Sequence, residues 1–298
     1  MNQPLATVAT QFLDRPHVAE STTRSYELTL MPLLKQYGSW SMELLDAEIL
    51  SEYLNSLTHL SYTTHHRHQA TLNALLNFSV RKGYIRSNPI ALMKHRTPDK
   101  SKEEHLSDQP IRFLSSEQLE TLYQAIYNDA RLYALVKLLH HTGARISELL
   151  ALDLAEVDLK QRQFQVVGKG NKIRWCFYSK DAAEALQHYI KFYRLVPSPA
   201  LFTAQKTPTS QVSRLSYRTA HHYWKQSIQN YTQLQGARMH DLRHTFATER
   251  IGIMGLEELR ALMGHRHIQT TLRYQTVTSQ QAQGAAQRAF QYLENAEQ

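Results

Sequence analysis

Apolar residues recur at helical spacing along most of this chain, and the pattern changes to a β-type run in one region. Residues three or four apart share one face of a helix, so each such segment predicts a helix that buries one side. The exception comprises two runs rich in β-favouring residues, Phe164–Val167 and Ile173–Tyr178. The glycine-containing turn 168–172 joins them, which predicts a hairpin. The fold is therefore expected to be mainly α with a small β-sheet or hairpin in the second part of the chain. The expected helices cover residues 22–37, 46–57, 63–82, 131–141, 181–193, 212–229, 239–253, 256–263 and 279–294.

Proline and glycine modify the helices expected in the first hundred residues. Pro32 lies inside the first helical run and predicts a kink or break there. Gly83 follows the third run and suits the end of a helix. A further short helix is expected after Asn88-Pro89, so that this part forms a compact helical bundle.

A linker divides the chain into two domains. The stretch 97–112 contains Pro98 and Pro110, carries mixed charges and lacks apolar periodicity, as exposed connections do. Ser115 and Gln118 then form a capping box that predicts the start of a helix. The expected organisation is a helical domain at 1–97, a linker at 98–112 and a second domain at 113–298.

Composition excludes several classes of protein. The single cysteine, Cys176, excludes a disulfide framework and a Cys-rich zinc site. No apolar run approaches the roughly 18–20 residues that span a bilayer, and the N-terminus lacks the order of a secretion signal. A soluble, cytoplasmic protein without a membrane partner is therefore expected.

The charge balance is basic. The 298 residues carry a net charge of +8 with a pI near 9.4. Residues 113–298 hold 22 basic and 15 acidic side chains, net +7, whereas residues 1–97 hold 9 and 7, net +2. Such a balance suits a polyanion such as nucleic acid, although a basic soluble protein without that partner fits the composition equally well.

Two segments in the middle of the chain could place cations against a phosphate. Arg145 follows Gly143 at an expected junction between helices, where its guanidinium could fork onto two phosphate oxygens. The alternative is a surface arginine that pairs with Glu148. Lys169 lies near the tip of the hairpin between two glycines, which allow close approach to a ligand. The alternative there is a solvated basic turn.

Two later segments add histidines, an arginine and a tyrosine. His240 and Arg243 lie three apart, on one helix face, and could address a single phosphate. His240 and His244 also have the spacing of zinc ligands, but the glutamate of the metalloprotease pattern is missing. Tyr274 follows His265 by nine residues, and nothing in that segment alone distinguishes it from a packing tyrosine.

The segments together resemble the tyrosine recombinase (phage integrase) family. Arg145 matches the family's first arginine box, His240 and Arg243 its His-x-x-Arg box, and the segment from His265 to Tyr274 its last box. The resemblance covers roughly residues 113–280, and the helical front part is similar to that of Xer-like members. The sequence departs from the family at the run after the hairpin and at position 239, where a proline often stands. These departures leave open whether the relative is a housekeeping Xer protein or comes from a mobile element.

The resemblance implies a fold, a reaction and its residues. It implies a two-domain DNA clamp, with a core-binding (SAM-like) helical domain and a catalytic domain that exchanges strands through a 3′-phosphotyrosyl intermediate without ATP, metal or another cofactor. The implied nucleophile is Tyr274, with Arg145, Arg243 and His265 on the phosphate, Lys169 as acid, His240 as base and Glu148 orienting the site.

The resemblance also implies partners. They are double-stranded DNA with short recombination sites and further copies in a synaptic homo-tetramer, with or without a related recombinase, on the nucleoid. A type IB topoisomerase-like enzyme that only relaxes DNA, and a catalytically silent DNA-binding regulator, remain alternatives.

Overall fold

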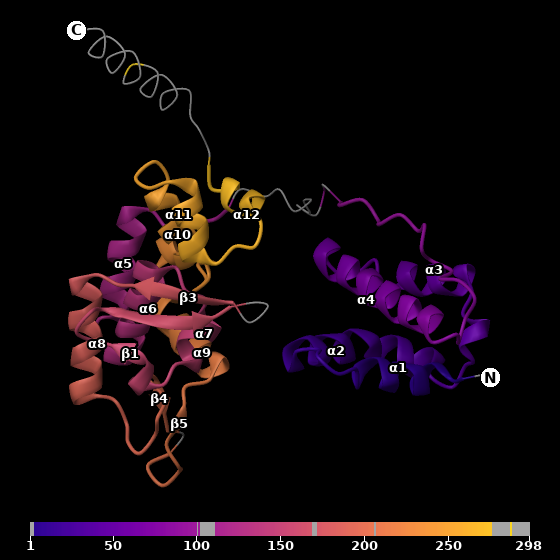
Figure 1. Cartoon of the computed structure of the whole chain (residues 1–298), viewed down its shortest axis with the longest axis horizontal. Helices are drawn as coiled ribbons and strands as arrows, with labels where there is room; N and C mark the ends of the chain where they lie inside the picture. The colour runs from indigo at the N-terminus through magenta and orange to yellow at the C-terminus, as the bar shows by residue number, and fades with distance from the viewer. Residues whose placement is uncertain are drawn as a thin grey trace. The chain divides into compact units, whose positions relative to one another are not determined.

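The chain separates into two compact units in a computed structural model, Met1–Gln109 and Pro110–Gln298 (Figure 1). The structure describes residues 3–99, 101, 111–168, 172–205, 207–275 and 287. No helix within these ranges is long and apolar enough to cross a membrane. The units are described one at a time below.

The first unit is a bundle of helices. It contains α1 (Leu5–Leu13), α2 (Glu20–Tyr37), α3 (Ala47–Ser56) and α4 (Tyr62–Arg81), with a short 3-10 turn at Met42–Leu44. The Asp46 side chain begins α3 by accepting a hydrogen bond from the Ile49 amide, at 2.9 Å. The apolar faces meet in one core, formed by Leu5, Phe12, Leu30, Leu33, Leu50, Leu54, Leu72, Leu75, Leu76 and their neighbours.

Two features of the first unit differ from expectation. Of the kink or break expected at Pro32, the break does not occur, because α2 continues from Glu20 to Tyr37. Pro32 has no amide N–H to donate to the Leu28 carbonyl four residues earlier. Both residues lie on the exposed side of the helix, where water can bind that carbonyl instead. No helix follows Asn88-Pro89 in the described residues. The Asn88 side chain binds the Ile90 amide and both Asn73 and Asn77, which holds a turn instead.

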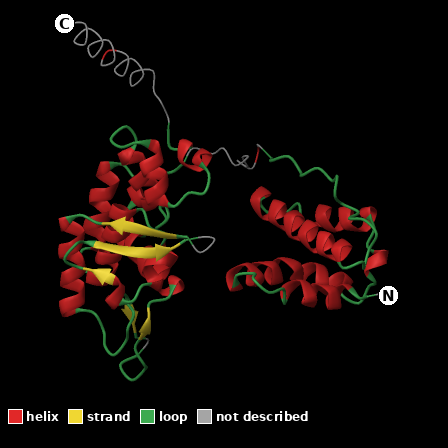
Figure 2. Cartoon of the chain, viewed as in Figure 1, coloured by secondary structure: helices red, strands yellow, loops and turns green. Residues whose placement is uncertain are grey.

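The second unit packs helices against small antiparallel sheets (Figure 2). Its helices are α5 (Ser116–Ile126), α6 (Ala130–Thr142), α7 (Ile146–Ala151), α8 (Lys180–Phe192), α9 (Tyr217–Ile228), α10 (Asp241–Arg250), α11 (Leu256–Met263) and α12 (Ile268–Leu272). The capping box predicted at Ser115 and Gln118 begins α5, as expected. The helix expected at 212–229 starts later, because Ser213–Arg214 pairs as a strand. The helix expected at 279–294 falls outside the described residues, apart from Gln287.

The predicted hairpin forms the main part of a three-stranded sheet. Strands β1 (Val157–Asp158), β2 (Gln163–Val167) and β3 (Ile173–Phe177) pair in that order, with Val166 opposite Arg174 and Phe164 opposite Cys176. Alternate residues of β3 therefore face the protein, and Arg174 is one of them. A second pair, β4 (Thr203–Ala204) and β5 (Ser213–Arg214), lies apart from this sheet.

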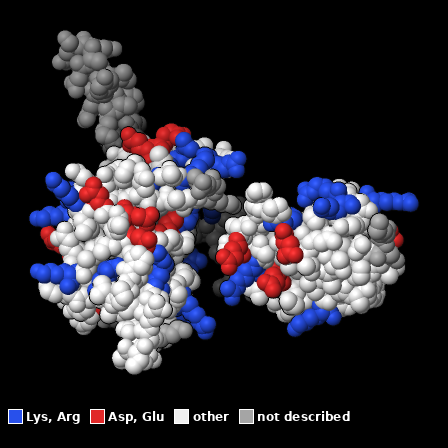
Figure 3. Space-filling model, turned by 60° about the horizontal axis from the view of Figure 1, so that its bottom comes forward, with Lys and Arg blue, Asp and Glu red and all other residues white. Residues whose placement is uncertain are grey.

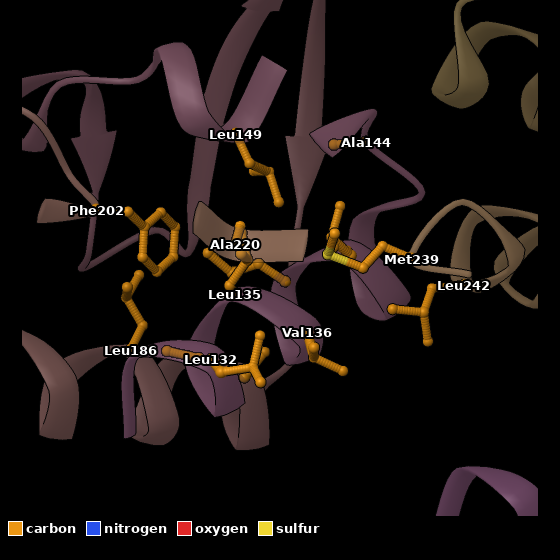
Figure 4. Close-up of a cluster of buried hydrophobic side chains, with 14 of the residues drawn as sticks. Leu132, Leu135, Val136, Ala144, Leu149, Leu186, Phe202, Ala220, Met239 and Leu242 are labelled. Carbon is orange, nitrogen blue, oxygen red and sulfur yellow. The ribbon is translucent and has the colours of Figure 1, made fainter. Parts of the chain in front are cut away.

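One hydrophobic core holds together helices and a strand of the second unit that carry polar side chains described in the next section. Helix α6 lies at its centre and contacts α8, α9, α10 and β3. Side chains from α6, α7, α8 and α10 meet there with Phe202, which directly precedes β4 (Figure 4). The helical side chains include Leu132, Leu135, Val136, Leu149, Leu186 and Leu242. The predicted fold class, mainly helical with a small sheet in the second part, is confirmed.

Candidate active site

Gly143 makes the sharp exit from α6 that places Arg145. Its φ of +61° ends the helix in the left-handed conformation, and an added Cβ would lie 2.5 Å from the Phe246 ring. Arg145 then precedes α7, with 34% of its side chain exposed. Its guanidinium is therefore partly buried and still accessible to a ligand.

Glu148 links this junction to the hairpin. Its carboxylate accepts from the Arg145 amide at 2.7 Å and from the Arg145 guanidinium at 3.0 Å. Arg174 forks onto the same carboxylate, at 2.9 and 2.6 Å, and donates its Nε–H to the Leu262 carbonyl. Burial alone would raise the pKa of Glu148, but hydrogen bonds from Arg174 and Arg145 lower it overall. The carboxylate therefore stays ionised and holds both cations.

This network was only partly predicted. The pairing of Arg145 with Glu148, which the sequence offered as the alternative to a phosphate contact, is present. Glu148 is buried, however, so the pair belongs to the interior rather than the surface. Arg174 was not predicted to contribute, although its inward position in the alternating pattern of β3 was a signal for it.

Replacing Arg174 by methionine is expected to destabilise the second unit by about 3 kcal/mol, the lower end of the range for breaking a buried ion pair, because Arg145 still binds Glu148. Urea denaturation measures the loss. The exposed pair of Lys180 and Glu184 is the matched control, and Lys180→Met should cost less than about 1 kcal/mol. Equal losses in the two variants would contradict the role given to Arg174.

Arg243 binds the ends of two helices to each other, because it contacts the carbonyls that close α6 and α11. It projects from α10, is 3% exposed, and donates to the carbonyls of Gly143 and Met263. Burial and repulsion from Arg145 and Arg174 lower the pKa of Arg243 to about 10. The guanidinium groups thus repel one another, and an anion bound among them would relieve that repulsion.

His265, which follows α11, and Tyr274, which follows α12, lie close to Arg243 and Arg145. His265 is buried, and its Nδ1 lies 2.9 Å from the Thr271 hydroxyl. Burial, followed by the charges of Arg243, Arg145 and Arg174, lowers the pKa of His265 to about 4. In the tautomer whose Nδ1 accepts from the Thr271 hydroxyl, the neutral ring presents an Nε2–H donor.

Tyr274 follows α12 and is 8% exposed. Its ring lies parallel to that of His265, with centroids 6.3 Å apart. Burial raises the pKa of Tyr274 despite the opposing charges of Arg243, Arg273 and Arg145. The phenol is therefore protonated at neutral pH and needs a proton acceptor before it can act as a nucleophile.

The two histidines with the spacing of zinc ligands, His240 and His244, lie side by side at the start of α10. His240 immediately precedes α10, and its ring centroid lies 4.7 Å from that of His244. His244 Nδ1 lies 2.8 Å from the Tyr274 hydroxyl. Among the described residues, no group of three or more His, Cys, Asp or Glu side chains is arranged to hold a metal ion.

The structure brings most of the predicted residues into one cluster, and Lys169 lies outside the described residues. Helices α10, α11 and α12 gather at one end of the second unit, next to β3 (Figure 1). The cluster combines several guanidinium groups, neutral imidazoles and one phenol, which suits binding of a phosphodiester and attack on it. Its members, called the arginine cluster below, are Arg145, Glu148, Arg174, His240, Arg243, His244, His265 and Tyr274.

Comparison with known proteins assigns the family. The model described as "Phage integrase family" matches residues 112–281, more than half of the chain. The chain therefore belongs to the phage integrase family, and its resemblance to Xer-like tyrosine recombinases is confirmed.

Two curated relatives and one solved structure illustrate the likeness. The tyrosine recombinase XerC of Pediococcus pentosaceus is 27% identical, over 82% of this chain and 81% of its own length. XerD of Haemophilus influenzae is 26% identical, over 88% and 89%. The integrase of the transposon Tn1549, solved in complex with a circular intermediate DNA, shares the fold, with a TM-score of 0.75 and 21% identity over 96% of this chain and 99% of that one.

Proposed function

We propose that this protein is a site-specific DNA recombinase, which cuts and rejoins DNA strands through a covalent link to Tyr274. One observation carries the proposal: the Tyr274 phenol lies against an imidazole nitrogen and close enough to Arg243 and Arg145 for their charges to act on its pKa. A phosphodiester needs its negative charge neutralised before a nucleophile can approach, and this cluster offers both functions.

The reaction follows from these groups. The Tyr274 oxygen attacks phosphorus, an O–P bond forms, and the bond to the 5′ oxygen breaks. The energy of the phosphodiester is kept in the protein–DNA link, so the 5′ hydroxyl of another strand can reverse the step without ATP. Arg145, Arg243 and the Nε2–H of His265 would bind the non-bridging oxygens, whose charge grows in the transition state.

The remaining site residues keep supporting roles in the proposal. Lys169, at the turn of the hairpin, would protonate the leaving oxygen. Glu148 would orient Arg145, since it holds both the amide and the guanidinium of that residue. His240, which the sequence led us to expect as the base, has its pKa lowered by burial and by the charges of Arg243 and Arg238, and it would bind a phosphate oxygen beside Arg243.

Double-stranded DNA is the partner that this chemistry requires. The Tn1549 integrase is solved on DNA, which supports the same partner here. The first unit, expected at 1–97 and followed by the linker 98–112, would bind the core of the recombination site beside the catalytic domain. On the faces that Figure 3 shows, Lys and Arg side chains occur in several groups separated by acidic and neutral surface. Exchange between two sites would need a homo-tetramer, or a mixed one with a related recombinase.

Two other functions compete with this one. A type IB topoisomerase-like enzyme would use the same chemistry without choosing a sequence, and a silent regulator would bind DNA without cutting it. The match to the integrase model over residues 112–281 favours recombination over relaxation. The buried phenol with its proton acceptor favours an enzyme over a regulator.

Capture of covalent adducts from sheared genomic DNA of the source organism separates these functions. We expect SDS-resistant protein–DNA complexes whose ends, when sequenced, fall at one short site. Scattered ends would indicate relaxation, and DNA that the protein retains only without SDS would indicate a regulator. Adducts should persist in excess EDTA, because arginines supply the charge that metals provide elsewhere. A loss in EDTA that zinc alone restores would favour the metal site.

A further inference from the structure

His244 lies against the oxygen that the proposed reaction uses. Its Nδ1 is 2.8 Å from the Tyr274 hydroxyl, and the centroids of the two rings are 5.6 Å apart. The histidine stands on α10, one turn after His240, and reaches the tyrosine that follows α12. His265 also borders the tyrosine, but its ring lies parallel to the phenol and its Nδ1 binds Thr271. The imidazole directed at the hydroxyl is therefore that of His244.

Burial of the phenol and the lowered pKa of the imidazole favour a hydrogen bond in which Tyr274 donates and His244 accepts. Tyr274 is nearly sealed from water, so its hydroxyl proton needs a protein acceptor. Burial, together with the charges of His240, Arg238 and Arg243, lowers the pKa of His244 to about 4. At neutral pH the ring is consequently uncharged, and its Nδ1 can carry the lone pair that accepts this proton.

We propose that His244 is the general base that takes the proton of Tyr274 as the tyrosine attacks the DNA phosphate. The inference rests on the proposed function and deepens it, because it assigns the acceptor of that proton to a residue outside the family motifs noted in the sequence.

The step balances in atoms and charge. The Tyr274 oxygen forms a bond to phosphorus while its proton moves to His244 Nδ1, which becomes an imidazolium. The bond from phosphorus to the 5′ oxygen breaks, and that oxygen receives a proton from the acid, proposed above as Lys169. Rejoining runs the same transfers backwards and restores the neutral imidazole.

Bound DNA would strengthen the base. In the free protein, His244 faces Arg238, His240, Asp241 and Arg243 from α10 and the residues before it, and Tyr274 and His265 from other elements. Cations dominate this set, which disfavours an imidazolium. A phosphate held by the arginine cluster adds negative charge and so raises the pKa of His244 when the proton must move.

His244, and not His240, lies within hydrogen-bond distance of the Tyr274 hydroxyl among the described contacts. The His240 ring meets that of His244 edge to face, and within the described residues no hydrogen bond joins it to Tyr274. A base must lie within hydrogen-bond reach of the proton it removes. His244 meets this condition in the free protein, whereas His240 would have to move to do so.

The decisive variant is His244→Asn, whose amide oxygen can accept the same hydrogen bond but cannot hold a proton. Adduct formation would be followed on a nicked duplex of the captured site, with full-length protein, across a range of pH. We expect DNA binding within about twofold of the unmodified protein and cleavage about 10²–10⁴-fold slower. The rate of the variant should keep rising with pH up to and beyond the ordinary phenol pKa of about 10, because burial raises the pKa of Tyr274. The unmodified protein should reach a plateau at lower pH.

A matched control comes from a second buried pair. His140 Nδ1 lies 2.5 Å from the Tyr123 hydroxyl, its Nε2 pairs with Glu249 of α10, and none of the three belongs to the arginine cluster. His140→Asn disturbs a comparable contact and should leave the rate and its pH profile unchanged, apart from any loss of stability.

Should the asparagine variant fold poorly, His244→Ala with added imidazole gives an independent measurement. The rate should recover with imidazole and with substituted imidazoles in order of their basicity, which a merely structural role would not produce. Rescue that ignores basicity would overturn the base role, and so would a His244→Asn protein with a normal rate and pH profile. Adducts from the unmodified protein that Tyr274→Phe lacks would still uphold the recombinase. If the unmodified protein formed none, both proposals would fail.

Discussion

Replacing Tyr274 by phenylalanine should abolish the covalent protein–DNA adduct while leaving DNA binding almost unchanged. The substitution removes one oxygen, which is the proposed nucleophile, and retains the ring that packs beside His265. The lost hydrogen bond to His244 should cost only about 1 kcal/mol of stability. SDS gels of a nicked duplex of the captured site measure the adduct, and mobility shifts measure the binding.

A second buried tyrosine provides the control for this result. Tyr178 donates its hydroxyl proton to the Asp158 carbonyl, apart from the arginine cluster. Tyr178→Phe should form adducts at the normal rate. An adduct that survived in the Tyr274→Phe protein would transfer the nucleophile to another residue and remove the basis of the proposed reaction.

Replacing Arg145 by lysine should slow cleavage about 100- to 1,000-fold, although the charge is conserved. A guanidinium can bind two phosphate oxygens at once while it also binds Glu148, whereas an ammonium is a single point of charge. DNA affinity should change much less, since many phosphate contacts contribute to it. Single-turnover cleavage of the nicked duplex gives the rate.

Arg131→Lys is the control for a general effect of losing a guanidinium. Arg131 donates to the Thr203 carbonyl and stacks on Tyr223, in another part of the second unit. Its replacement should leave the cleavage rate within about twofold of normal, as surface substitutions away from a site usually do. A full cleavage rate in Arg145→Lys would mean that the fork geometry is not needed.

Local pattern predicted most of the secondary structure because helices and hairpins depend on near neighbours. The run at 256–263 became α11 with both ends as expected, and the capping residues Ser115 and Gln118 start α5. The local pattern gave a wrong prediction where a segment pairs with a partner elsewhere in the chain. A helix was expected to include Ser213–Arg214, but this segment forms a strand because it pairs with Thr203–Ala204.

The residue types that gather at the site were predictable from residue order, and the contacts between them were not. Motif spacing pointed to Arg145, His240, Arg243, His265 and Tyr274, which the structure gathers in one cluster. The contact between His244 and Tyr274 joins residues 30 positions apart, and that between Arg174 and Glu148 joins residues 26 apart. Neither spacing leaves a periodic trace in the sequence.

The amino-acid sequence by itself determined the helical class of this protein, its hairpin, its family and the types of side chain at the site. Each of these features depends on residues that lie close together in the sequence. Only the tertiary structure decided which groups share a proton or a carboxylate. Burial sets their pKa values, and burial exists only after distant segments have packed together.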